Sequence, residues 1–70
     1  MALIRQAVRI DEVSTVLTYI GRATIGSLDT DPVWSIMQIT VVGTVTSILY
    51  SGGTTEYSSV WADRASLSYL

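Results

Sequence analysis

The stretch that decides the fold is VWSIMQITVV from Val33 to Val42, followed by Gly43-Thr44 and then by VTSILY from Val45 to Tyr50. β-Branched and aromatic residues dominate both runs, and these residue types favour extended strands. A two-residue connection with glycine at its first position is compatible with a type II′ turn, which joins antiparallel strands tightly. The stretch therefore predicts a β-hairpin in the middle of the chain.

The first strand of this hairpin carries apolar residues on both faces. Trp34 and Ile36 share one face of an alternating strand, whereas Met37, Ile39 and Val41 share the other. This pattern predicts either a strand covered on both sides or a β-bulge that resets the register. Both alternatives suit a protein that is wrapped by neighbouring subunits.

The segment before the hairpin predicts another strand, over residues 16–25, and then a polar loop over residues 26–32. The residues of this strand that we expect to be buried alternate along one face: Leu17, Tyr19, Gly21, Ala23 and Ile25. A glycine in the middle of a strand indicates a bulge or the close approach of another backbone. Gly21 is therefore expected at one of these two features.

The two ends of the chain carry weaker signals. Residues 2–10 alternate imperfectly and favour a strand, so residues 1–13 are predicted as an edge strand or an N-terminal arm. After the hairpin we expect a turn over 51–55, a short strand or irregular lead-in over 56–60, a helical or 3₁₀ turn over 61–64, and a closing strand over 65–69.

These elements predict an all-β fold: a small antiparallel sandwich or partly open barrel of five or six short strands, in one domain spanning 1–70. The expected structural core consists of large apolar side chains: Tyr19, Trp34, Ile36, Ile39, Leu49, Trp61 and Leu67. The two tryptophans are assigned to this core rather than to a sugar-stacking platform, because large aromatic residues in a small β domain usually fill its interior.

Composition predicts self-association. A chain of 70 residues buries only about 60% of its unfolded surface, and without Cys or His it has neither disulfides nor the usual zinc ligands for support. Hydrophobic residues make up 49% of the chain and charged residues only 14%, against about 25% charged in a typical domain. We therefore expect a homo-oligomer; the alternative is a monomer with a surface of serine and threonine.

Charge and hydropathy exclude two classes of partner. A net charge of −2 with scattered arginines argues against nucleic-acid binding, which needs clustered positive charge. No apolar run approaches the roughly 20 residues that span a bilayer, so membrane insertion is not expected. The first residues lack the basic and apolar regions of a secretory signal, which predicts assembly in the cytoplasm of the producing cell.

No residue pattern predicts catalysis, a cofactor or a metal. Serine has no His, Lys or Cys to activate it anywhere in the chain. Asp29 and Asp31 flank Thr30, but a capped turn explains them better than a cation site, which needs more oxygen ligands. Gly52-Gly53 is followed by no Lys-Ser/Thr pair and is interpreted as a turn.

Arg64 is the polar residue with the sharpest predicted role. It can stack on an indole or bind a carboxylate through its planar guanidinium, which would either close the C-terminal turn within the chain or reach a partner. The residues that we name as candidate partner contacts are Arg64, Tyr69 and Ile4.

Three segments together resemble small structural proteins of tailed bacteriophages. They are Tyr19-Ile20-Gly21-Arg22-Ala23, the Trp-x-Ile-x-x-Ile strand from Trp34 to Ile39, and the Trp-x-x-Arg-x-x-Leu-x-Tyr ending from Trp61 to Tyr69. The resemblance implies a non-enzymatic, multicopy virion component of the capsid surface, neck, tail or fibre, which self-associates and docks on other virion proteins after assembly in the bacterial host cytoplasm. A small receptor- or carbohydrate-binding β module is the main alternative, and an enzyme inhibitor is another.

Overall fold

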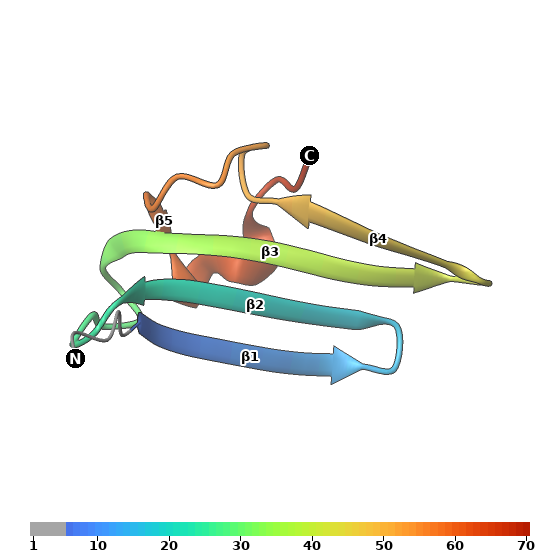
Figure 1. Ribbon diagram of the computed structural model, residues 1–70, viewed down its shortest axis with the longest axis horizontal. Coiled ribbons are helices and arrows are strands. Elements are labelled where there is room, and N and C mark those ends of the chain that lie inside the picture. Colours follow the sequence, from blue (N-terminus) through green and yellow to red (C-terminus); the bar gives the residue numbers. More distant parts are fainter. Residues whose placement is uncertain (1–5) are drawn as a thin grey trace, which may run out of the picture.

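The computed structural model describes residues 6–70 and shows an open antiparallel sheet with one short helix (Figure 1). The elements in chain order are β1 (Gln6–Ser14), β2 (Leu17–Thr24), β3 (Pro32–Val42), β4 (Val45–Tyr50), β5 (Ser59–Val60) and the 3₁₀ helix η1 (Trp61–Ser66). The sheet order is β1-β2-β3-β4, and β5 pairs with the first residues of β3. The predicted all-β class is confirmed, as is the predicted N-terminal strand.

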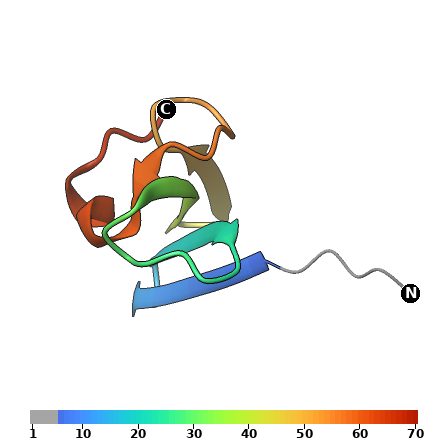
Figure 2. The same ribbon diagram turned by 90° about the vertical axis from the view of Figure 1, so that its left-hand side faces the viewer.

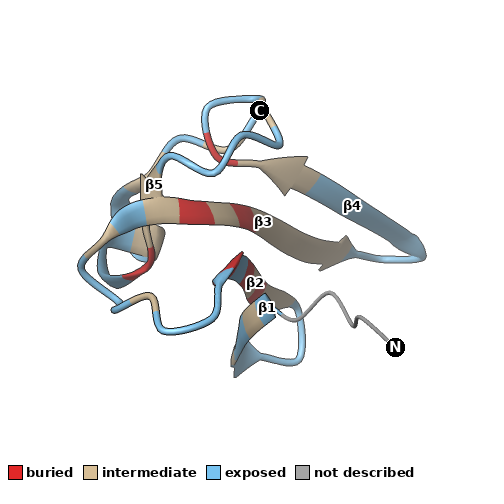
Figure 3. Cartoon of the chain, turned by 60° about the vertical axis from the view of Figure 1, so that its left-hand side comes forward, coloured by how far each residue is buried: buried red, intermediate tan, exposed pale blue. Residues whose placement is uncertain are grey.

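The central hairpin forms where the sequence predicts it. Val42 pairs with Val45 across the two-residue connection, in which Gly43 has a φ of 61° and Thr44 does not have a positive φ. This is the combination that a type II′ turn requires. The hairpin extends β3 beyond β2, and most of β4 is exposed along it (Figure 3).

Strand β3 organises the sheet because it pairs with three other strands. It pairs with β2 from Ser35 to Thr40, with β4 from Met37 to Val42, and with β5 near its start. The register with β5 shifts between Pro32 and Trp34. The registers with β2 and β4 are continuous from Ser35 to Val42, so the predicted bulge does not explain the apolar pattern of this strand, whose apolar residues lie on both faces.

A small core lies on one face of the sheet, which we call the inner face. Its buried hydrophobic residues are Tyr19, Ala23, Trp34, Ile36 and Trp61. Helix η1 packs across this face and brings Trp61 onto the strands (Figure 2). Leu67 and Tyr69, which follow η1, pack against the same cluster, as do Ala7, Leu17 and Val33.

Two residues predicted for the core lie outside it. Ile39 is half-buried and points to the opposite side of β3 from Trp34 and Ile36, because side chains alternate along a strand. Leu49 is also half-buried; it pairs with Gln38 and does not belong to the buried cluster. The predicted closing strand is wrong as well, since η1 continues to Ser66 and only Tyr69 forms a bridge, to Ser51.

Gly21 lies beneath the two tryptophans. A Cβ atom built on Gly21 would lie 2.5 Å from Cε3 and 2.7 Å from Cζ3 of Trp61, and 3.1 Å from Cε3 of Trp34. The predicted close approach is therefore present, but a side chain rather than a backbone makes it. A glycine here lets an indole ring lie directly on the strand.

We predict that Gly21→Ala lowers the free energy of unfolding by about 1–3 kcal/mol, the usual cost of overpacking a core. Trp61 is 4% exposed and cannot move aside without leaving the cluster. Urea unfolding followed by tryptophan fluorescence measures the effect. Thr24→Ala, at an exposed position of the same strand, is the control and should change stability by less than about 0.5 kcal/mol. Equal stability of Gly21→Ala and the parent would contradict the crowding.

Candidate functional site

The described part of the chain, residues 6–70, holds no pocket and no group of three acidic, His or Cys residues that could bind a metal. Asp29 and Asp31 have structural roles in the loop before β3. Asp29 Oδ1 accepts a hydrogen bond from Arg9 Nε at 3.3 Å, and Asp31 Oδ2 accepts one from the Leu28 amide at 2.9 Å. The predicted capped turn is confirmed for Asp31, whereas the Asp29 side chain pairs with Arg9. Over these same residues, none of the helical structure has the length and hydrophobicity needed to cross a bilayer.

Arg64 links helix η1 to strand β1. Its Nε donates to Asp11 Oδ2 at 3.0 Å, and its Nη1 donates to the Trp61 carbonyl at 3.1 Å. The guanidinium carbon lies 4.6 Å from the centre of the Trp61 ring, within the range of a cation–π contact. Both predicted modes, stacking on an indole and binding a carboxylate, therefore occur together within one chain.

Tyr69 extends this link to the end of the chain. Its hydroxyl donates to the Arg64 carbonyl at 2.8 Å, and its ring centre lies 5.6 Å from that of Tyr19. Burial raises the pKa of Tyr69 from 10.0 to about 12, with the neighbouring Tyr19 adding to the increase and Arg64 opposing it. Two of the three candidate partner contacts thus have intramolecular roles, and the third, Ile4, lies outside the described residues.

A second arginine repeats the arrangement on the other tryptophan. The guanidinium carbon of Arg9 lies 5.4 Å from the centre of the Trp34 ring, and Arg9 also forms the ion pair with Asp29. The Trp34 indole Nε1 donates to the Leu28 carbonyl at 2.9 Å. Each indole of the core is therefore covered by an arginine that is itself paired with an aspartate.

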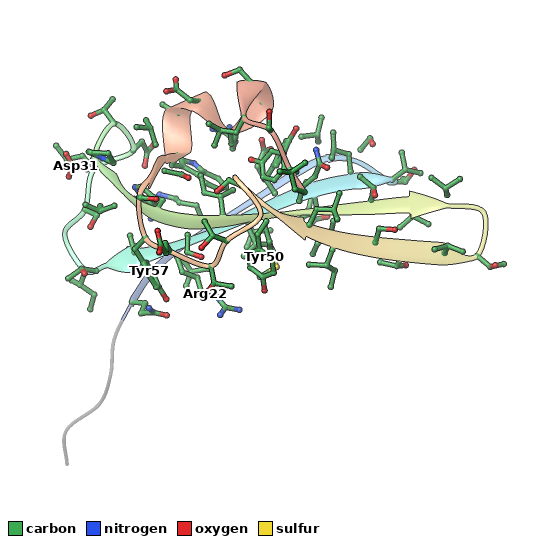
Figure 4. All side chains as sticks on the ribbon, turned by 90° about the horizontal axis from the view of Figure 1, so that it is seen from above. Arg22, Asp31, Tyr50 and Tyr57 are labelled. Carbon is green, nitrogen blue, oxygen red and sulfur yellow. The ribbon has the colours of Figure 1, made fainter. Side chains whose placement is uncertain are left out.

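The other side of the sheet, which we call the outer face, is apolar and is not covered by η1. The strand registers place Ile10, Ile20, Met37 and Tyr50 in one row across all four long strands. Two rows flank this central row. One consists of Glu12, Thr18, Ile39 and Ile48. The other, on the opposite side, contains Val8, Arg22 and Ser35. Arg22 and Tyr50 point away from η1 in Figure 4.

Several outer-face side chains are well exposed: Val8 is 48%, Ile48 is 53% and Ile10 is 61% exposed. Tyr57, from the loop between β4 and β5, borders one end of this face, where its hydroxyl accepts a hydrogen bond from Gln6 Nε2 at 3.0 Å. The sequence indicated this surface only in β3, where Met37, Ile39 and Val41 form an apolar second face; the strand registers show which residues of the other strands share it.

Comparison with protein-family models, with curated proteins and with solved structures finds no significant match to this chain. The geometry itself offers two distinct surfaces. One is the inner face, whose charged groups are paired within the chain, and the other is the apolar outer face.

We predict that Asp11→Asn lowers the free energy of unfolding by about 1 kcal/mol, because it weakens the only ion pair among residues 6–70 that joins β1 to η1. The two side chains are 28% and 34% exposed, so the loss should shrink at about 1 M salt, where screening is strong. Thermal unfolding at low and high salt measures both effects. Glu56→Gln removes the same charge from an exposed residue outside the observed ion pairs and should leave stability unchanged.

We predict a loss of stability in alkali that depends on Tyr69. A folded-state pKa of about 12, above the ordinary 10.0, favours the neutral phenol in the folded protein. Its contribution is complete below pH 10 and disappears as the pH rises through 12. Tyr69→Phe should lose about 1 kcal/mol at neutral pH with its hydrogen bond, and should show a shallower decline in alkali than the parent. Parallel pH curves for the two proteins would contradict this assignment.

Proposed function

We propose that this protein is a non-enzymatic, multicopy structural component of a tailed-phage virion, which acts by self-association and by docking on other virion proteins. The capsid surface, neck, tail and fibre are the parts of the particle in which such a component serves. Its mechanism is cohesion, because many weak and identical contacts add up when copies are held in a closed arrangement.

The observation that carries this proposal is the balance between buried and exposed apolar residues. Within residues 6–70, eleven large hydrophobic side chains are exposed, whereas five hydrophobic residues are buried. Single exposed apolar residues are ordinary, but a contiguous apolar surface marks an interaction site. The rows of the outer face make part of this surface contiguous, which supports association as the use of the protein.

The resemblance to tailed-phage structural proteins supports the virion assignment. Its three segments contribute Gly21, Trp34 and Trp61, which lie against one another in this chain. The resemblance therefore concerns residues that determine the packing of a small β domain.

The carbohydrate-binding alternative gains no support from the tryptophans. A sugar-stacking platform needs an exposed aromatic ring, whereas Trp34 is 0% and Trp61 is 4% exposed. The most exposed aromatic side chain among the described residues, Tyr57, is used to form a hydrogen bond with Gln6.

We predict that the purified protein forms a discrete oligomer. Sedimentation across a concentration series, from about 1 to 100 μM, measures the solution mass. The expected result is a closed assembly whose mass is a whole multiple of 7.6 kDa, because a symmetric interface closes on itself. A folded monomer at every concentration that also fails to bind the other proteins of its particle would overturn the proposal.

A further inference from the structure

We propose that the outer face is a two-fold symmetric interface, on which a second copy of this chain stacks its own outer face. The symmetry axis runs across the strands, along the row of Ile10, Ile20, Met37 and Tyr50. This inference rests on the self-association proposed above and assigns it to one surface and one geometry.

The first argument is the size and chemistry of the surface. Four strands about 4.8 Å apart and three side-chain rows about 6.7 Å apart give a face of roughly 390 Å² per copy. Stacking two such faces buries roughly 770 Å², the size of a weak interface, which many copies held together on one particle would reinforce. The face also carries the residue types that are enriched in such interfaces, in Tyr50, Met37 and Arg22.

The second argument is the missing layer. A sheet with apolar residues on both faces needs a layer on each side, and within residues 6–70 only the inner face receives one, from η1 and the residues that follow it. Medium-sized side chains such as Ile10, Ile20 and Ile39 suit sheet-on-sheet packing, in which two sheets lie about 10 Å apart with their side chains interdigitated. A second outer face supplies a surface of the same kind.

The third argument is the position of the charges. Within residues 6–70 the outer face carries two charged residues, Glu12 and Arg22, and neither forms a salt bridge among the described residues. By contrast, Arg9 and Arg64 are both paired. Glu12 and Arg22 lie on opposite sides of the central row, about 13 Å apart along the strand direction, which is too far for a pair within one copy.

A two-fold axis along the central row brings Glu12 of one copy close to Arg22 of the other. It reverses the order of the rows, so that the row of Glu12 in one copy lies over the row of Val8 and Arg22 in the other. Because Val8 and Arg22 are direct neighbours across β1 and β2, the Glu12 carboxylate comes within reach of the second copy's guanidinium. The symmetry produces this pair twice, and the surface is therefore complementary to itself in charge as well as in hydrophobicity.

A charge-swap series tests the geometry, with the dimer dissociation constant measured by sedimentation equilibrium. Arg22→Glu and Glu12→Arg each place like charges together twice, and each should raise the dissociation constant by about tenfold. The double variant restores two opposite pairs and should return within about threefold of the parent. Circular dichroism of each variant establishes that it is folded.

A second series tests the apolar centre of the face. Ile20→Glu should abolish the dimer up to about 100 μM, because it buries two unpaired carboxylates at the interface. Val45→Glu is the matched control: it adds the same charge to a residue that is 61% exposed, at the hairpin tip, and should leave the dimer intact.

The outcomes separate this inference from the proposed function. A parent oligomer that none of the outer-face variants weakens, or single and double charge variants that weaken it equally, would overturn the stacked geometry and leave self-association standing. A monomeric parent that binds another virion protein, with Ile20→Glu blocking that binding, would overturn the second copy as occupant and leave docking standing. A parent that does neither would overturn both.

Discussion

The contact on which the structure depends is the packing of Trp61 against Trp34 over Gly21. The two indole rings lie with their centres 5.8 Å apart and their planes tilted by 39°, and the strand beneath them has no Cβ to separate them from it. Burying an aromatic side chain contributes more than any single polar contact in so small a core. With five buried hydrophobic residues among those described, the position of η1, and with it the coverage of the inner face, follows from this contact.

The polar contacts of the inner face hold the segments that surround the two indole rings in position. Arg9 joins β1 to the loop before β3, and Arg64 joins β1 to η1, each lying over an indole as it does so. Partly exposed ion pairs and cation–π contacts contribute only about 0–1 kcal/mol each. They cannot replace the tryptophan packing as a source of stability, but they fix which segments meet, in a chain that has no disulfide to do so.

The sequence predicted what is local and missed what depends on distant partners. The β3–β4 hairpin was predictable because β propensity and Gly43 determine it within a few residues. Tyr19, Trp34, Ile36 and Trp61 are buried as expected, whereas Ile39 is not, because its burial depends on which face of the sheet η1 covers. The predicted neighbour of Gly21 was another backbone, but the structure places the Trp61 side chain there. The sequence could not show this, because the two residues lie 40 positions apart. The extent of the outer face was not predictable for the same reason, because it follows from the registers of four strands.

The uncovered outer face explains why a protein with so small a core would associate as proposed. A single sheet with one covered face is half of a sandwich, and the apolar residues on the other face of β3 gain little free energy while they remain in water. Glu12 and Arg22 lie where a second copy in the proposed orientation would pair them, and each is too far from the other to gain from its own chain. In the proposed dimer each copy contributes one sheet of a two-sheet sandwich. The second copy then completes the hydrophobic packing that a chain of 70 residues provides on one side only.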